Sequence, residues 1–296
     1  GAVINRAIIA YARTRPKKGY YSKTFMAYKY FAHNGKLLPA EQANVPLSRV
    51  EYSYGFGVYE SIRVSKGKIL FLREHCERLM SSAKVIGLNH TFTVDFVEKS
   101  IKELVKHNEV VSCNLKVLLI GGRTDDTATL DILCLNPLFP DRKLYRDGAT
   151  CITYYYEREF PQAKTLNMLS SYLAYRKAAQ AGAYDALLIN RKGFITEGTR
   201  TNFFAIKGKT ITSPKSADIL PGVTRTNVLK VAKQNGYVVK EEDISSAELH
   251  SYDGFFITST SAKIMPIRSI DDHDCGSPPA VLQELMSVFG EFLVDN

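Results

Sequence analysis

A proline-containing break near the middle of the chain constrains the fold more than any other feature. Residues 136–141 read Asn-Pro-Leu-Phe-Pro-Asp. The two prolines interrupt both helical and strand periodicity, because proline lacks an amide donor and has a fixed φ. We therefore predict a small N-terminal domain and a larger C-terminal domain. The predicted bounds are an arm over 1–22, a small domain over 23–138, a linker over 139–146 and a large domain over 147–296.

The part before the break shows strand patterns, then helix patterns, then strand patterns again. This order is typical of α+β folds, and Asn34-Gly35 is a hairpin signal. The expected strands are 26–32, 114–120 and 129–135, with two more on either side of a Lys66-Gly67 turn, and the expected helices are 73–86 and 95–107.

The part after the break is richer in strands than in helices. The expected strands are 149–156, 185–189, 194–197, 202–206, 210–212, 237–240 and 254–258. The expected helices are 169–181, a segment that ends at 234, 246–250 and 279–294. The whole pattern predicts a two-domain α+β protein, with a small N-terminal α/β domain and a larger β-rich C-terminal α/β domain.

Two glycines, Gly55 and Gly57, stand just before an alternating strand pattern. Glycines in this position indicate a close backbone approach or an unusual turn. A simple hairpin corner is the alternative, but the tyrosines and the arginine nearby favour a functional site.

Several function classes are disfavoured by composition. No stretch of about eighteen apolar residues exists, and the first residues lack the pattern of a signal peptide. The five cysteines form no C-x-x-C pair, and the six histidines show no ligand spacing. We therefore expect a cytoplasmic protein with no membrane partner, no disulfide framework and no metal.

The formal net charge is +9, and basic residues and tyrosines gather in the first 23 residues. A basic, aromatic segment is compatible with nucleic-acid binding. The remaining positive charge is spread evenly, however, which favours a solvated arm or a segment that packs on a partner subunit. We expect no nucleic-acid partner.

Three segments suggest cofactor chemistry. Lys164 follows an apolar strand among small residues, and burial lowers the pKa of a lysine amine and makes it a nucleophile. Gly222-Val223-Thr224 precedes a helix, whose first amides can bind phosphate, and residues 258–261 offer hydroxyls. A surface lysine, a capped helix and a polar turn are the alternatives. No G-x-G-x-x-G or P-loop motif occurs. A lysine, a carboxylate that faces a ring (here Glu197) and a small phosphate site are together the features of a pyridoxal-phosphate site.

In combination, six segments resemble the class IV aminotransferases, the fold-type IV pyridoxal-phosphate enzymes. That family includes branched-chain aminotransferase, D-amino-acid aminotransferase and aminodeoxychorismate lyase. The segments occur in the family's order over about residues 26–290. They are Tyr54-Gly55-Phe56-Gly57-Val58-Tyr59-Glu60, His75-Cys76-Glu77-Arg78-Leu79, Lys164-Thr165-Leu166-Asn167, Glu197-Gly198-Thr199-Arg200-Thr201-Asn202, Leu220-Pro221-Gly222-Val223-Thr224-Arg225 and Thr258-Ser259-Thr260-Ser261.

The resemblance implies a D-amino-acid aminotransferase-like fold with a barrel-like C-terminal domain, pyridoxal 5'-phosphate as cofactor, and a homodimer. It implies that Lys164 forms a Schiff base with the cofactor and carries the reaction's proton. Glu197 would pair with the pyridine nitrogen. The phosphate would be held by Arg78, by the backbone amides of Val223 and Thr224, and by the hydroxyl of Thr260.

The residues expected to bind substrate are Tyr54, Tyr59, Arg63, Arg123, Met168 and Arg200. Tyr54 resembles the branched-chain enzymes, which usually carry a tyrosine where Met168 stands. D-amino-acid enzymes usually bind the substrate carboxylate with an arginine and a histidine two residues apart, but the loop of Arg123 lacks such a histidine. We expect Arg200 or Arg123 to replace that pair. An Arg200 that points to solvent or to the phosphate is the alternative.

The predicted function is the transfer of an amino group between an α-amino acid, of branched-chain L- or D-amino acid type, and a 2-keto acid such as 2-oxoglutarate. The alternative on the same fold is a lyase that acts on a chorismate-derived amine. The alternative from another class is a basic, non-enzymatic binding protein.

Overall fold

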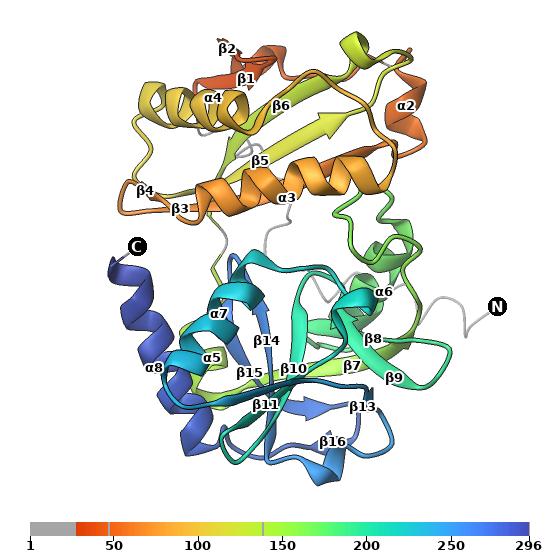
Figure 1. Ribbon diagram of the computed structural model, residues 1–296, viewed down its shortest axis with the longest axis vertical. Helices are drawn as coiled ribbons and strands as arrows, with labels where there is room; N and C mark the ends of the chain where they lie inside the picture. The colour runs from red at the N-terminus through yellow and green to blue at the C-terminus, as the bar shows by residue number, and fades with distance from the viewer. Residues whose placement is uncertain (1–27, 47, 138, 296) are drawn as a thin grey trace, which may run out of the picture.

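The computed structural model describes residues 28–46, 48–137 and 139–295. The predicted arm over 1–22 lies outside these residues. Two separate sheets form the frame of the described structure, one at the top and one at the bottom of Figure 1. No described helix is long and apolar enough to span a bilayer.

The first sheet is antiparallel and follows the order β2-β1-β6-β5-β3-β4. Its strands are β1 Tyr30–His33, β2 Lys36–Pro39, β3 Gly57–Ser65, β4 Lys68–Ile69, β5 Cys113–Ile120 and β6 Thr129–Leu135. The predicted hairpin at Asn34-Gly35 is confirmed. Both residues have positive φ, 48° and 78°, as a two-residue turn between β1 and β2 requires.

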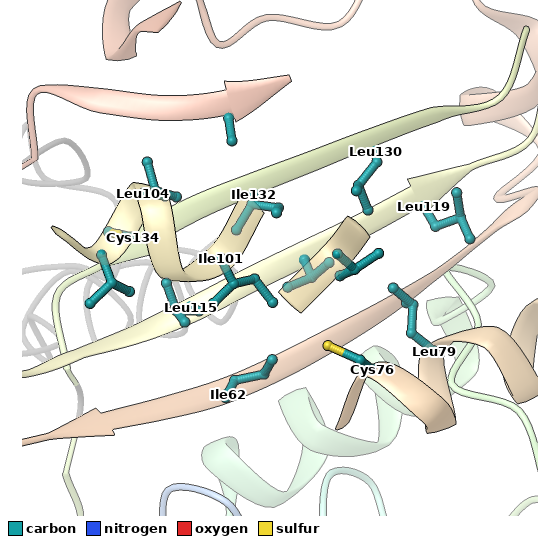
Figure 2. Packing of buried hydrophobic residues seen from close by; sticks show 14 of the residues in the cluster. Ile62, Cys76, Leu79, Ile101, Leu104, Leu115, Leu119, Leu130, Ile132 and Cys134 are labelled. Carbon is teal, nitrogen blue, oxygen red and sulfur yellow. The ribbon is translucent and has the colours of Figure 1, made fainter. Parts of the chain in front are cut away.

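Two helices cover one face of this sheet, α3 over Leu72–Val85 and α4 over Val94–His107. Thr93 caps α4 by accepting a hydrogen bond from the Phe96 amide. Alternate residues of β5 and β6 pack with both helices in one apolar core, shown in Figure 2. The short elements of this part are η1 Ala40–Gln42, α2 Val50–Ser53 and η2 Asp125–Thr127.

The second sheet closes on itself. Its strands follow the order β12-β11-β10-β14-β15-β7-β8-β9-β13, with β16 beside β15. An additional pairing of β9 with β10 closes the ring β10-β14-β15-β7-β8-β9, which confirms the barrel-like sheet that the resemblance implied. The closing pair is Glu197 with Asn202.

The strands of the second sheet are β7 Ala149–Tyr155, β8 Asp185–Ile189, β9 Phe194–Gly198, β10 Asn202–Lys207, β11 Thr210–Ser213, β12 Val238–Glu241, β13 Ile244–Ser245, β14 Gly254–Ser259, β15 Lys263–Ile270 and β16 His273–Asp274. Strand β15 was not predicted, because Pro266 interrupts its pattern. Its pairing with β7 begins only at Ile267, one residue after the proline.

Both faces of the ring are apolar. On β10, Phe203 packs with residues of the other ring strands, while Phe204 packs with α7 and α8. The helices are α5 Arg142–Asp147, α6 Leu169–Gln180, α7 Val223–Gln234 and α8 Ala280–Asp295, with short turns η3 Ser216–Asp218 and η4 Leu249–Ser251. The predicted linker thus contains most of α5, and the domain bounds themselves stay a prediction.

Candidate active site

A cavity of about 920 Å³ lies where the two parts of the chain meet. Its walls come from β3, α3 and β5 on one side, and from the Lys164 loop, the β9–β10 turn, the start of α7 and the end of β14 on the other. Segments separated by more than a hundred residues therefore face one space.

The loop that carries Lys164 is bonded to the first sheet as if it were another strand. The Tyr59 amide donates to the Lys164 carbonyl at 2.9 Å, and the Leu166 amide donates to the Gly57 carbonyl at 2.8 Å. From the helix side, the Lys164 amide donates to Oγ of Ser82 at 3.1 Å. These bonds fix the backbone on both sides of the lysine.

Gly55, which precedes β3, and Gly57, its first residue, make this approach possible. A Cβ at Gly57 would lie 2.7 Å from a methyl of Leu166, and Gly55 has a positive φ of 69° beside the Asn167 backbone. The predicted close backbone approach is therefore confirmed, and the segment approached is the Lys164 loop itself.

The Lys164 amine lies in an environment that weakens its charge. Its Nζ stands 4.5 Å from the centre of the Tyr59 ring. Burial, and then the positive charge of Arg78, lower the pKa of Lys164 to about 8. A larger share of the amine is therefore uncharged near neutral pH than in an exposed lysine.

Glu197 is buried at the end of β9, beside the strand pairing that closes the ring. Its Oε1 accepts from Nη1 of Arg158 at 2.8 Å, and its Oε2 accepts from the Leu220 amide at 3.1 Å. Burial raises the pKa of Glu197, and the charge and hydrogen bond of Arg158 oppose that rise. The carboxylate is thus removed from water, but it accepts hydrogen bonds from Arg158 and from the Leu220 amide.

Arg78 projects from α3 into the cavity. Its Nε and Nη2 bond the buried carboxylate of Glu60, and its Nη1 donates to the Pro221 carbonyl at 3.2 Å. Pro221 directly precedes Gly222, the N-cap of α7. The guanidinium therefore lies beside the first amides of that helix, where helix geometry favours an anion.

The start of α7 is closely packed at Gly222. A Cβ there would collide with Oδ1 of Asn202. Nδ2 of the same asparagine donates to the Leu220 carbonyl at 2.8 Å and so holds the loop that precedes α7. Val223, Thr224 and Thr260 also line the cavity. In the same wall, Oγ1 of Thr258 is buried and has no hydrogen-bond partner among residues 28–46, 48–137 and 139–295.

The structure brings Tyr59, Met168 and Arg200 to the cavity wall, but not Tyr54, Arg63 or Arg123. Tyr54 is 79% exposed, and the Arg123 side chain is 81% exposed beside Glu51. Arg63 donates to the Ser261 carbonyl at 3.2 Å and covers the Phe139 ring. Arg200 lies with its guanidinium 3.9 Å from the Tyr175 ring centre.

Sequence reasoning missed two cations of the site, Arg158 and Lys116. Arg158 braces Glu197 and also donates to the carbonyls of Pro161, Phe160 and Ala163, just before Lys164. Its signal in the sequence was only its position six residues before that lysine. The Lys116 amine lies 3.4 Å from the Tyr59 ring centre, and burial lowers its pKa to about 8. Its signal was only a lysine between two apolar residues, Leu115 and Val117, of a predicted strand.

The part of the chain that the structure describes contains no candidate metal centre. Within those residues, no group of three or more His, Cys, Asp or Glu side chains is arranged to hold a metal ion.

Comparison with known proteins places these features in a family context. A model of the family described as Amino-transferase class IV matches residues 57–270. The chain is 33% identical to a D-alanine aminotransferase of Bacillus licheniformis, over 82% of this chain and 89% of that protein. It is also 33% identical to a putative branched-chain-amino-acid aminotransferase of Methanocaldococcus jannaschii, over 80% and 86% respectively.

Solved structures agree with the sequence matches. The holo form of a branched-chain amino acid aminotransferase from Thermobaculum terrenum, crystallised with PLP, is 27% identical to this chain and has a TM-score of 0.80. The match covers 90% of this chain and 94% of that one. The similar proteins thus carry the names of two substrate classes.

Proposed function

The chain belongs to the class IV aminotransferases, which use pyridoxal phosphate, and we propose that Lys164, Glu197 and Arg78 are the centre of its active site. The observation that carries this proposal is their meeting in one cavity. An amine with a lowered pKa, a buried carboxylate and a guanidinium at a helix N-terminus line the same space, although they come from three distant segments.

The residues present fit the cofactor. Its phosphate would take the first amides of α7 and the guanidinium of Arg78, which lies beside that helix start. Buried Oγ1 of Thr258, without a protein partner in the described residues, supplies a further polar atom in that wall. When bound, the cofactor supplies an electron sink for the bonds at the substrate's α-carbon.

The protein's own groups then divide the work. Lys164 holds the cofactor and afterwards moves a proton at the substrate α-carbon, because its lowered pKa leaves a larger share of the amine able to accept a proton near neutral pH than in an exposed lysine. Glu197 would keep the ring nitrogen protonated, and Arg158 opposes the rise in the pKa of Glu197 that burial causes. Val223, Thr224 and Thr260 complete the phosphate site with Arg78.

Two cations of the cavity wall are candidates for the substrate carboxylate. Arg200 stands at the β9–β10 turn and Lys116 on β5, so they belong to opposite walls of the cavity. A dicarboxylic keto acid such as 2-oxoglutarate has two carboxylates, so each could bind one of the two cations. Tyr59 and Met168 would line the side-chain pocket.

We also propose that the enzyme is a homodimer. Leu169, Tyr172 and Leu173 expose an apolar face on α6, next to the cavity residue Met168. Their spacing of three and four residues places them on one helix face. In such a dimer the exposed Tyr54 and Arg123 would be available to the cavity of the partner subunit.

Absorbance spectra of the cofactor-loaded enzyme test this function. The enzyme is mixed separately with L-leucine, L-glutamate, D-alanine and D-glutamate, and conversion of the cofactor to pyridoxamine phosphate is followed. In a transaminase, at least one of these amino acids converts the cofactor to pyridoxamine phosphate, and 2-oxoglutarate then restores pyridoxal phosphate. Absence of conversion with every amino acid, including a wider panel, would refute transamination by this site. The converting donors would show whether L- or D-amino acids are used.

A further inference from the structure

Two buried polar side chains, Glu60 and His75, lie behind Arg78, on the side away from the cavity. We infer that Glu60, oriented by His75, is a positioning residue that fixes the Arg78 guanidinium for recognition of the cofactor phosphate. The inference rests on the proposed role of Arg78. It adds Glu60 and His75 to the residues on which the reaction depends.

The contact between Glu60 and Arg78 is a fork. Glu60 lies on β3 and is 1% exposed. Its Oε1 accepts from Nε of Arg78 at 2.7 Å, and its Oε2 accepts from Nη2 at 2.8 Å. Two parallel bonds of this kind fix the plane of a guanidinium as well as its position. Arg78 is therefore held in one orientation.

His75 holds the carboxylate in turn. Its Nδ1 lies 2.8 Å from Oε2 of Glu60, and because an ionised carboxylate only accepts, Nδ1 carries the hydrogen. His75 stands three residues before Arg78 on α3, so both side chains project from the same helix face toward β3. The ring is fully buried, and its Nε2 has no partner within the described ranges. If the ring carries its hydrogen only on Nδ1, its single N–H is bonded to Glu60.

Glu60 remains charged despite its burial. Burial favours the neutral carboxyl, but the guanidinium of Arg78 and the hydrogen bond of His75 outweigh it and hold the pKa of Glu60 well below its usual range. A buried ion pair often adds little stability over an apolar pair of the same size. A role in orienting Arg78 explains why charged groups occupy this position.

The fork determines which edge of Arg78 faces the cofactor site. With Nε and Nη2 taken by Glu60, Nη1 points away, toward the Pro221 carbonyl and the start of α7. A phosphate at that helix start meets a guanidinium edge that is already turned toward it. Less side-chain freedom is then lost on binding, which strengthens binding without a new contact.

The test compares two ligands that differ only in the phosphate. Cofactor-free enzyme is titrated with pyridoxal phosphate and with pyridoxal, for the wild type, Glu60→Gln, Arg78→Met and the double variant. We expect Glu60→Gln to weaken pyridoxal phosphate about ten- to hundredfold, as loss of a supporting partner commonly does, and to leave pyridoxal binding unchanged. In the Arg78→Met background, Glu60→Gln should have no further effect.

Glu98→Gln is the matched control. Glu98 also pairs with an arginine of α3, Arg73, but outside the cavity, and its loss should change neither affinity. Equal weakening of pyridoxal phosphate and pyridoxal by Glu60→Gln would overturn the inference, as would independent effects of Glu60→Gln and Arg78→Met. Failure of the wild type to prefer pyridoxal phosphate over pyridoxal would instead contradict the proposed phosphate site itself.

Two further variants keep the test decisive if Glu60→Gln folds poorly. His75→Phe leaves the ion pair intact but removes the hydrogen bond from Nδ1 of His75, so it should produce a smaller loss confined to pyridoxal phosphate. Glu60→Asp keeps the charge but withdraws the carboxylate, and it should behave like Glu60→Gln. Normal affinity of both variants for pyridoxal phosphate would overturn the inference. Thermal unfolding of each variant separates lost folding from lost phosphate recognition.

Discussion

Nη1 of Arg158 lies 2.8 Å from Oε1 of Glu197, and this contact favours the ionised form of the carboxylate proposed to face the cofactor ring. Burial raises the pKa of Glu197, whereas Arg158 lowers it. The same arginine donates to carbonyls of residues 160, 161 and 163, so it also braces the loop that leads to Lys164. One side chain therefore supports two of the proposed active-site residues.

Replacement of Arg158 by methionine should raise the pKa of Glu197, so that the carboxyl stays protonated to a higher pH. The acid limb of the kcat/KM profile should then move upward by at least about one pH unit, which is about a tenfold loss on that limb. Arg158→Lys keeps the charge and should retain the acid limb while losing part of kcat. An unmoved acid limb in Arg158→Met would contradict this account of Glu197.

Lys164→Ala should abolish transamination while leaving the fold intact. The loss should be about 10²–10⁴-fold or more, because the variant lacks both the cofactor-linking amine and the group that moves the proton. Turnover is measured with the best amino donor found, and near-UV circular dichroism checks the fold. Turnover at the wild-type rate would remove Lys164 from the mechanism.

The lowered pKa of Lys164 can be measured without substrate. Condensation of cofactor-free enzyme with pyridoxal should rise with pH around a midpoint near 8, because burial and Arg78 disfavour the ammonium. An ordinary lysine would give a midpoint of about 10.4. Lys116→Met should keep the signal and Lys164→Ala should lose it, since Lys116 titrates in the same range. A midpoint above about 10 would be incompatible with the buried amine.

Lys116 and Arg200 should discriminate substrates by their carboxylates. Lys116→Met or Arg200→Met should raise KM for 2-oxoglutarate by about tenfold or more, because each removes a charged hydrogen-bond donor of about 1.5–3 kcal/mol. If the two cations bind different carboxylates, only one of the variants should impair a monocarboxylic keto acid. Arg123→Met, at an exposed site on the same chain, is informative as well. It should be neutral unless the partner subunit brings Arg123 to a cavity. Unchanged KM in both Lys116→Met and Arg200→Met would remove these residues from substrate binding.

Gly222→Ala should weaken pyridoxal phosphate binding. The added methyl would collide with Oδ1 of Asn202 and disturb the loop that leads into α7. The reduction should be measured as a ratio of pyridoxal phosphate to pyridoxal affinity. Gly290→Ala is the control, because nothing lies within 4 Å of the place that an added methyl would take on α8, and alanine there should stabilise by about 0.5–1 kcal/mol. Wild-type affinity in Gly222→Ala would show that the helix start is not the phosphate site.

Much of the fold followed from local pattern. Helices α4 and α6 and strands β5, β6 and β8 occur where apolar periodicity predicted them, and the turn at Asn34-Gly35 has the φ values that its residues favour. Their apolar periodicity is a pattern of residues close in sequence, so it can be read without the fold. Strand β15 was missed, because its proline is tolerated only where pairing with β7 has not yet begun.

The sequence by itself determined the order of the elements, the presence of Lys164 among apolar residues, and a motif set that resembles one family. Tertiary structure alone decided which side chains share the cavity. On β5, Leu115 and Val117 pack with the helices of the first core, so Lys116 faces the opposite side, toward Tyr59. Neither Lys116 nor Arg158 carried a distinctive local signal. The role of Lys116 depends on strand register, and that of Arg158 on the contact of its loop with β9, and both are fixed by contacts between residues far apart in the chain.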